Sequence, residues 1–270
     1  MTVCAAVEEL SLGPNQRVTD AIASAQGPVV FRGLVADWPL VTKSLDSDSS
    51  VMSYLEAAYN DAPVTAFLGD RDIEGRLFYR EDIADTNFSR LQTTLTSVLA
   101  QIREHATDDH APTVYMGSTP LDYCFPGMRE ANDLDLDDHR ATVRIWIGNR
   151  TRVAPHYDSM ENLACVVAGR RRFTVFPPEQ IANLYVGPLD LTPAGQAISL
   201  VDLNNPDFER FPRFAEALAS ARTVELDPGD AIYIPSIWWH AVEGLDNFNI
   251  LVNHWWQEAP EYLGTPADAL

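Results

Sequence analysis

Two residues in the second half of the chain place an imidazole and a carboxylate at a spacing that suits metal binding. His156 and Asp158 are separated by one residue in the run APHYD. In a β-strand, residues i and i+2 point to the same face, so these side chains would project together. A second histidine from elsewhere would complete a set of two histidines and one carboxylate, which leaves three coordination positions open on an iron ion. On its own, the His-x-Asp pattern is more typical of a surface or capping pair.

His240 is the candidate for the second histidine. It lies in the run GDAIYIPSIWWHAVEG, where Gly229 and Asp230 indicate a turn before an apolar strand and Pro235 indicates the end of that strand. A histidine in so apolar a segment needs a polar partner, which can be a metal or another group of the core. The remaining histidines are weaker candidates, because three lie in polar stretches and the fourth alternates with an inward-facing asparagine: His105, His110, His139 and His254.

The elements that would hold these residues are short strands. From residue 142 onward, turn residues separate the runs TVRIWIG, APHYD, NLACVVAG, RRFTVF, ISLVDL, TVEL, DAIYIP, HAVEG and NILVNHWW. Short strands at regular spacing predict a sandwich or barrel of antiparallel sheets. A single helix over about residues 213–220 interrupts the series.

The first 140 residues mix helices and strands. Strands are expected over 29–34, 64–68 and 77–80, and a helix capped by Ser50 is expected to run through Tyr59. Apolar residues at helical spacing predict an amphipathic helix over 91–105. We interpret residues 1–140 as a region that buttresses a barrel in 141–257, with a short tail at 258–270. The two larger parts are expected to form one cooperative unit.

Composition narrows the range of partners. The chain has 270 residues and a net charge of −20, which disfavours phosphate backbones and anionic membranes as partners. Three cysteines without close spacing indicate free thiols in a reducing compartment. The N-terminus lacks the basic region of a signal peptide, so we expect a cytoplasmic protein. The acidic run Asp133, Asp135, Asp137 and Asp138 lacks the glycine of a calcium loop at its sixth position and is expected to be a solvated loop.

Several linked motifs resemble the cupin-like JmjC oxygenases, the family that includes the asparaginyl hydroxylase of hypoxia-inducible factor. These motifs are APHYDSMENLACVVAGRRRFTVFPPEQ, GDAIYIPSIWWHAVEG and ILVNHWW, and PVVFRGLVADWPL is similar to the family's N-terminal strand. The similarity covers most of residues 28–257. It implies a mainly β fold, a double-stranded β-helix of the cupin or jelly-roll type, flanked by N-terminal helices and strands.

The resemblance also implies a site. It places the metal ligands of a catalytic centre at His156, Asp158 and His240, with Fe(II) as the metal and 2-oxoglutarate and O2 as cosubstrates. It further implies four side chains that bind the cosubstrate or line its pocket: Arg171, Asn162, Asn253 and Tyr115.

Two positions depart from the family pattern. Arg171 stands where the family uses a lysine for the far carboxylate of 2-oxoglutarate, and arginine can bind a carboxylate with two parallel hydrogen bonds. Val153 stands where the family often has a threonine that also contacts the cosubstrate, so one hydrogen bond of roughly 1 kcal/mol would be missing. These departures leave open whether the cosubstrate is the same.

The resulting hypothesis is a dioxygenase that hydroxylates a protein side chain or a small molecule. The alternatives are a cupin-type metalloenzyme with the same metal triad that does not use 2-oxoglutarate, and a non-catalytic binding module. A protein, peptide or small molecule is the expected substrate, and nucleic acid and membrane are not expected partners. The chain ends 14 residues after Trp256, without the long C-terminal helices through which the asparaginyl hydroxylase dimerises, so a homodimer would use another surface.

Overall fold

Strands with one apolar and one mixed face build the second half of the protein. The computed structural model describes residues 5–13, 16–81, 83–136, 139–193 and 195–257. In β8 (Thr142–Gly148), Val143, Ile145 and Ile147 are buried in the main core, whereas the alternate residues face the other way. This period of two lets one strand contribute both to the core and to the wall of a cavity.

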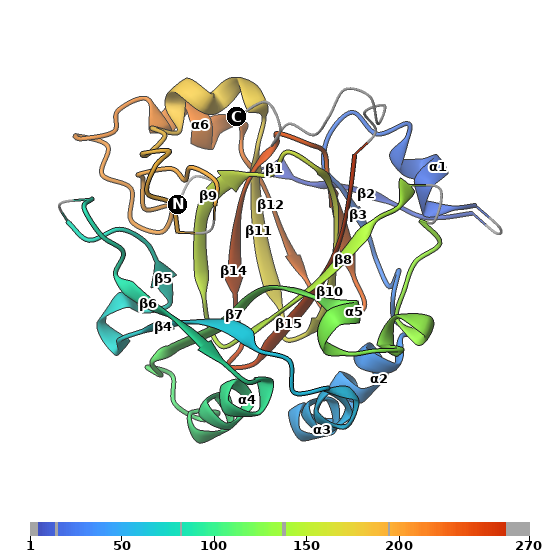
Figure 1. Cartoon of the computed structure of the whole chain (residues 1–270). Helices are drawn as coiled ribbons and strands as arrows, with labels where there is room; N and C mark the ends of the chain where they lie inside the picture. Colours follow the sequence, from blue (N-terminus) through green and yellow to red (C-terminus); the bar gives the residue numbers. More distant parts are fainter. Residues whose placement is uncertain (1–4, 14–15, 82, 137–138, 194, 258–270) are drawn as a thin grey trace.

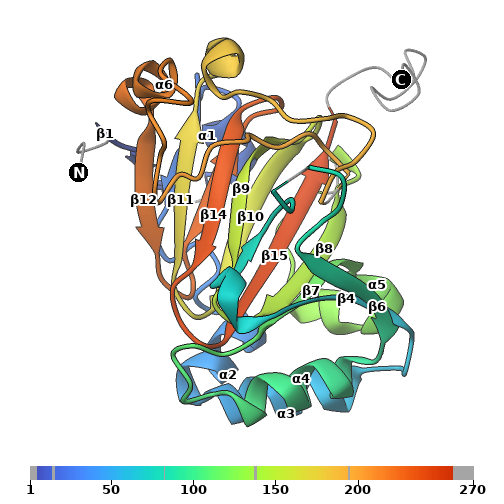
Figure 2. The ribbon, with the colours of Figure 1, turned by 90° about the vertical axis from the view of Figure 1, so that its left-hand side faces the viewer.

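Two sheets face each other and form the barrel (Figures 1 and 2). The first contains, in spatial order, β12 (Arg222–Leu226), β11 (Arg171–Phe176), β14 (Trp239–Gly244) and β9 (Arg152–Tyr157). The second contains β13 (Ala231–Ile234), β10 (Glu161–Ala168), β15 (Asn249–Trp256) and β8. Neighbouring strands within each group are antiparallel, and successive strands along the chain mostly alternate between the sheets. The expected mainly β, double-stranded β-helix fold is therefore confirmed.

The first half of the chain extends both sheets. β1 (Ala5–Ala6) and β5 (Arg76–Leu77) lie at the two edges of the first sheet. The second sheet is continued on one side by β3 (Val29–Phe31) and β2 (Glu8–Leu10), and on the other by β7 (Thr113–Pro120), β4 (Val64–Gly69) and β6 (Phe88–Thr93). The cooperative unfolding of the two parts stays a prediction, and the tail at 258–270 lies outside the described residues.

Helices cover the outer face of the second sheet. Figure 2 shows α2 (Pro39–Asp46), α3 (Asp48–Ala58) and α4 (Leu95–Glu104) at the end of the molecule opposite α6 (Phe214–Ser220). The main core joins these helices to β8, β10 and β15, and each fully buried Leu or Ile contributes roughly 1.5–3 kcal/mol. The short helices α1 (Val18–Ile22) and α5 (Leu121–Cys124) complete the described helices, together with 3-10 turns at Arg71–Ile73, Met128–Ala131 and Pro178–Asn183. Within the described ranges, no helix has the length and apolar character needed to cross a bilayer.

The helix predicted over 91–105 begins later than expected. Leu91 pairs with Ala66 in the ladder between β6 and β4 and is 47% exposed. The helix starts at Leu95 because the Thr94 hydroxyl caps it by accepting a hydrogen bond from the Ser97 N–H. Helical spacing alone did not reveal that Leu91 belongs to a strand.

Other predicted boundaries also shift. Ser47, not Ser50, caps the helix that ends at Ala58, and the strand expected at 29–34 ends at Phe31. The run ISLVDL forms only isolated bridges, such as that between His156 and Ile198. The strand predicted at 64–68 and the helix at 213–220 are present with small changes at their ends.

The acidic run is not simply solvated. Asp133 accepts a hydrogen bond from the ring of His254, which is fully buried, and also pairs with Arg129. Asp135 is exposed and forms an ion pair with Arg17, and Asp137 and Asp138 lie outside the described residues. The prediction of a solvated loop was therefore wrong for Asp133, because the deciding partner comes from a strand 121 residues away.

Candidate metal centre

The fold brings His156, Asp158 and His240 to one point. His156 lies in β9 and His240 in β14, and the two are directly opposite each other in the antiparallel ladder. Their ring centroids are 4.3 Å apart, and the His240 Nε2 atom is 3.6 Å from the Asp158 Oδ2 atom. One ligand atom from each of the three residues lies within 4.8 Å of the others. Bonds of about 2.0–2.2 Å to a shared metal would draw these atoms somewhat closer together.

Backbone carbonyls fix which nitrogen of each histidine can bind a metal. The Nδ1 atom of His156 lies 2.9 Å from the Ala154 carbonyl oxygen, and that of His240 lies 3.1 Å from the Trp238 carbonyl oxygen. A carbonyl oxygen can only accept, so each Nδ1 carries the proton and donates it. Both Nε2 lone pairs are therefore available to a metal, as in known histidine metal sites.

His240 is held in the neutral state that a metal ligand needs. Its side chain is 4% exposed, whereas that of Asp158 is 14% exposed. Burial, assisted by the neighbouring His156, lowers the pKa of His240 to about 4, although Asp158 acts in the opposite direction. The ring is thus unprotonated near neutral pH, and no proton has to leave before a metal binds.

A relay of two asparagines connects the triad with the second sheet. The Asn162 side-chain amide donates to the Asp158 Oδ2 atom at 3.4 Å, and Asn253 donates to the Asn162 Oδ1 atom at 2.6 Å. Both asparagines are buried, and the Oδ1 atom of Asn253 has no partner in the described structure. The relay orients the carboxylate and leaves a buried acceptor in the cavity wall.

Arg171 carries a buried charge in the same cavity. It lies at the start of β11 and is 1% exposed, and its Nε and Nη2 atoms have no partner in the described structure. Burial lowers the pKa of the guanidinium, and the nearby Tyr115 hydroxyl acts in the opposite direction. Burial likewise raises the pKa of the Tyr115 hydroxyl. A buried cation with unused donors is the feature that a carboxylate ligand would satisfy.

The cavity has a volume of about 520 Å³ and contains every predicted site residue. Its walls are largely apolar and aromatic, and Val153 is among them, as the sequence indicated. Further wall residues were not singled out by the sequence, among them Phe67, Arg144, Trp146, Phe173 and Gln196. Alternation in β8 placed Arg144 and Trp146 on one face, but only the ladder with β15 shows that this face is the inner one.

The tryptophans divide between the cavity and the core. Trp255 lines the cavity, and its ring lies 6.0 Å from that of Trp146 in an edge-to-face arrangement. Trp239 and Trp256 are buried in core clusters, and Trp238 packs against another cluster. Of the four tryptophans in the pairs 238–239 and 255–256, three therefore pack in the core and one lines the cavity.

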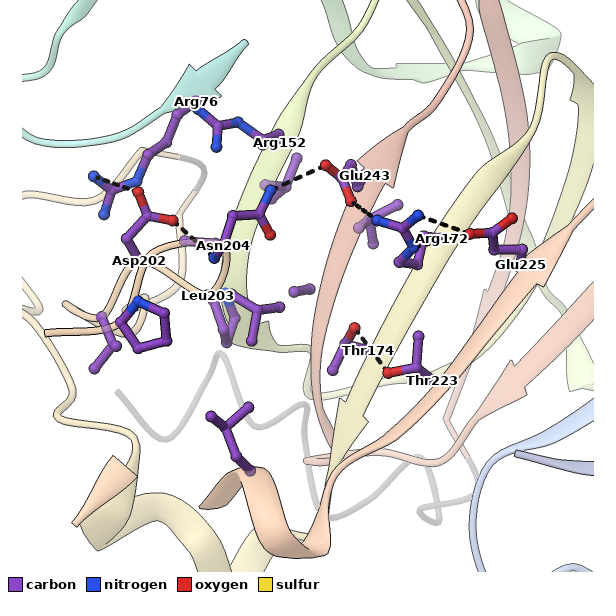
Figure 3. Close-up of a pocket in the computed structure, with 18 of the residues that line it drawn as sticks. Arg76, Arg152, Arg172, Thr174, Asp202, Leu203, Asn204, Thr223, Glu225 and Glu243 are labelled. Carbon is purple, nitrogen blue, oxygen red and sulfur yellow. Dashed lines mark hydrogen bonds and ion pairs between the residues drawn. The ribbon is translucent and has the colours of Figure 1, made fainter. Parts of the chain in front are cut away.

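A larger hollow of about 800 Å³ lies outside the barrel, along β9, β14, β11 and β12 (Figure 3). Its charged groups satisfy one another. Arg172 lies between Glu225 and Glu243, and Arg76 pairs with Asp202 (Figure 3). The triad and the partnerless cation both lie in the smaller cavity, which is therefore the candidate site despite its size.

Comparison with known proteins agrees with this geometry. The sequence matches the family of the cupin-like domain over residues 15–262. It is 26% identical to lysine-specific demethylase JMJ31 of Arabidopsis thaliana, with 85% of this chain and 46% of that protein aligned. It is 25% identical to lysine-specific demethylase 8 of Xenopus tropicalis, covering 93% of this chain and 53% of the relative. Human HSPB1-associated protein 1 is 34% identical over 94% of this chain and 53% of the human protein.

A β-helix barrel with a two-histidine, one-carboxylate cluster inside defines a cupin-type metal-binding fold. The chain belongs to the cupin-like domain family, within its group of JmjC-type oxygenases. The resemblance expected from the sequence is thereby confirmed. The chain spans about half the length of the curated relatives it matches.

Proposed function

We propose that the protein is an Fe(II)- and 2-oxoglutarate-dependent oxygenase that hydroxylates a protein side chain or a small molecule. One observation carries the proposal: Arg171, a buried cation whose Nε and Nη2 atoms have no partner among the described residues, shares a cavity with the His156, Asp158 and His240 cluster. A metal held by the cluster and a dicarboxylate held between metal and guanidinium would satisfy both features. The family membership of the chain supports the same chemistry.

The proposed roles of the residues follow from their positions. The two Nε2 atoms and the Asp158 carboxylate would hold the metal, and Arg171 with Tyr115 would bind the far carboxylate of 2-oxoglutarate. When bound, iron and 2-oxoglutarate supply the activation of O2 that inserts one oxygen atom into a C–H bond. Phe173, Trp146 and Leu251 would exclude water from the cavity.

Register explains how Arg171 could serve a metal-bound ligand. Arg171 lies opposite Gly244 in the ladder, and Val175, four residues further along β11, lies opposite His240. Four residues of strand span about 13 Å, and the long arginine side chain would cover part of that length. The remaining gap suits a five-carbon dicarboxylate better than a larger ligand.

The substrate class is a proposal of the same kind. Two relatives are named as lysine-specific demethylases, and hydroxylation of an N-methyl group followed by loss of formaldehyde would give demethylation from the same site. The net charge of −20 disfavours a nucleic acid, which leaves a peptide or a small molecule as the proposed substrate. A cytoplasmic location is also proposed. It is compatible with the free, buried thiols of Cys124 and Cys165, although Cys4 lies outside the described residues.

The test is an anaerobic titration of the protein with Fe(II) and then 2-oxoglutarate, followed by visible spectroscopy. We expect a metal-to-ligand charge-transfer band in the native protein and in His110→Ala, which changes an exposed histidine. We expect no band in His156→Ala. A native protein that binds iron but shows no band would contradict the proposal.

That contrary result would favour the second candidate, a cupin metalloenzyme with the same triad that does not use 2-oxoglutarate. The observation in its favour is Val153, which lines the cavity without the hydroxyl that often binds the cosubstrate in the family. Equilibrium dialysis with labelled 2-oxoglutarate separates the two candidates, because only the first predicts saturable binding that depends on the metal.

A further inference from the structure

Arg144 is a charged residue of the cavity that the proposed chemistry does not use. It lies in the middle of β8, is half-buried, and lines the same cavity as the triad. No carboxylate of the described residues lies within ion-pair distance of its guanidinium, and no hydrogen bond joins it to another described residue. The guanidinium therefore has five N–H donors that can bind a ligand in the cavity.

Partnerless arginines are not the rule in this protein. In the outer hollow, Arg172 contacts two glutamates at 2.7 Å and Arg76 contacts Asp202 at 3.5 Å (Figure 3). Arg32, Arg103 and Arg170 also pair with carboxylates. The chain has 39 acidic and 19 basic residues, and many of the described arginines have a carboxylate within ion-pair distance, although Arg222 is one that does not. For Arg144, the cavity wall offers one carboxylate, that of Asp158, which belongs to the metal cluster.

The register places Arg144 beside the metal cluster and away from Arg171. Arg144 is directly opposite Asn253 in the ladder between β8 and β15, so the two side chains share the inner face. Asn253 donates to Asn162, which in turn donates to Asp158. Arg171, by contrast, is 1% exposed and lies opposite Gly244, at the far end of β14 from His240. The cavity therefore has a closed cationic end and a second cation near the metal on the more exposed side.

Charge counting leaves Arg144 uncompensated when the proposed ligands are present. Besides the histidines, the cavity contains three charged side chains: Arg144, Asp158 and Arg171. A divalent metal, Asp158, Arg171 and a doubly negative 2-oxoglutarate together sum to zero. The charge of Arg144 remains, and half-burial in the cavity wall makes an unpaired charge less favourable than it would be in water. One further negative group would restore neutrality.

Neighbouring donors point to the same kind of ligand. The indole N–H groups of Trp146 and Trp255 are buried and have no acceptor in the described structure, and both rings line the cavity. Trp255 lies opposite Thr142, two residues from Arg144 on the same face of β8. Other buried atoms without partners occur elsewhere, such as the Thr113 hydroxyl, but these indoles adjoin an open volume. An anionic oxygen group could accept hydrogen bonds from all three side chains.

We propose that Arg144 binds an anionic oxygen group of the substrate, a carboxylate or a phosphate, and so directs an acidic substrate to the metal centre. This inference rests on the proposed function, because it assumes that 2-oxoglutarate occupies the Arg171 end. The indole rings of Trp146 and Trp255 form the apolar wall beside this subsite. The substrate is then acidic close to the position that is oxidised, even though the protein itself is acidic overall.

The test uses protein loaded with Mn(II), which does not turn over, and saturating 2-oxoglutarate. Three probes are compared: the N-acetyl, N-methylamide derivatives of aspartate, asparagine and phosphoserine. Paramagnetic relaxation of probe protons by Mn(II) reports binding near the metal, and titration gives dissociation constants. We expect the aspartate or the phosphoserine probe to bind on the order of 10- to 100-fold more tightly than the asparagine probe. The relative affinities of the two acidic probes distinguish carboxylate from phosphate.

Variants assign the preference to one residue. Arg144→Gln should remove the acidic preference, and Arg144→Lys should retain part of it. Arg222→Gln is the matched control, because Arg222 is a half-buried strand arginine outside the cavity. The control should keep the native preference. Calorimetry of 2-oxoglutarate binding in the same samples should give one dissociation constant for the native protein, Arg144→Gln and the control.

The outcomes separate the two hypotheses. Normal 2-oxoglutarate binding with equal relaxation of all probes, or with none, would overturn the role of Arg144 alone. Loss of 2-oxoglutarate binding in Arg144→Gln would assign Arg144 to the cosubstrate and would also overturn it. If the native protein fails to bind 2-oxoglutarate, the proposed function fails first, and the inference falls with it.

Discussion

The polar side chains on the two faces of β15 differ in whether they have hydrogen-bond partners. Asn253 points into the barrel, where its Oδ1 atom adjoins a cavity and has no partner among the residues that the structure describes. Its neighbour His254 points outward, is 0% exposed, and bonds Asp133 at 2.8 Å through its Nε2 atom. One residue of sequence thus separates a group open to a ligand from a group fixed to the body of the protein.

Because Asn253 and His254 are both polar and buried, the difference between them comes from what each face of β15 packs against. The outer face packs against helices and against the segment at residues 128–136. On this face, the ring centroids of Trp38 and His254 are 5.9 Å apart, and the Trp38 indole N–H donates to the Asp133 carbonyl oxygen. The inner face meets a volume of about 520 Å³. Inner polar groups are therefore expected to govern ligand binding at some cost in stability, and outer ones to govern stability alone.

The largest effect is expected from His254→Ala on the outer face. The substitution removes a buried ring and one hydrogen bond to a carboxylate, which together should lower the free energy of unfolding by about 4 kcal/mol. Urea denaturation would measure it. The dissociation constant for 2-oxoglutarate, measured below the transition, should be unchanged. A change in that constant without loss of stability would break the distinction between the faces.

A somewhat smaller effect is expected from the titration of His240 on the inner face in metal-free protein. Its pKa is lowered to about 4 in the folded state, so between about pH 6.5 and 4 the unfolded chain binds the extra proton. The free energy of unfolding therefore has its full value above pH 6.5. It falls by about 3 kcal/mol in all as the pH is lowered from 6.5 to 4.

The measurement is the free energy of unfolding against pH with chelator present. His240→Gln serves as the reference, because subtracting its profile removes the contribution of other titrating groups. The native profile should fall more steeply than the reference profile as the pH is lowered. Parallel profiles would show that the site does not hold His240 neutral.

Local pattern predicted most of the barrel strands and the shared face of His156 and Asp158, whereas the assignment of three metal ligands also needed the family resemblance. Alternation of apolar residues identified the barrel strands, and the His-x-Asp spacing required both side chains to share a face. The third member, His240, was found from its apolar surroundings, because a buried imidazole needs a partner. The structure brings these three residues together, and metal binding by them stays a prediction.

Features that depend on long-range pairing could not be predicted. The partner of His254 is Asp133, 121 residues earlier, and no local signal marks that contact. Leu91 fits the helical spacing of the residues after it, but pairing with β4 holds it in a strand. Arg144 was missed because alternation assigns two faces without saying which of them is inside.

The third effect comes from Arg171→Met, which replaces the buried cation with an apolar chain of similar length. We expect the free energy of unfolding to rise by about 2 kcal/mol, because an incompletely bonded charge leaves the core. Affinity for 2-oxoglutarate should fall by roughly 30-fold through loss of a charge-assisted hydrogen bond. Thermal denaturation and calorimetry would measure the two. Arg171→Lys should keep part of the affinity, and a variant that loses stability instead would show that Arg171 is structural.

The smallest effect is expected one residue away, from Arg172→Gln on the outer face of β11. Arg172 bridges Glu225 and Glu243 at 2.7 Å, but its side chain is 39% exposed. Solvent screens such pairs, so the free energy of unfolding should fall by less than about 1 kcal/mol, and less still in high salt. Substitutions of two adjacent arginines in one strand would then change the free energy of unfolding by different amounts and with opposite signs. Removal of Arg171 would raise it, and removal of Arg172 would lower it. Equal changes in the two variants, measured by denaturation at low and high salt, would mean that the cavity does not set the energetics of the charges that line it.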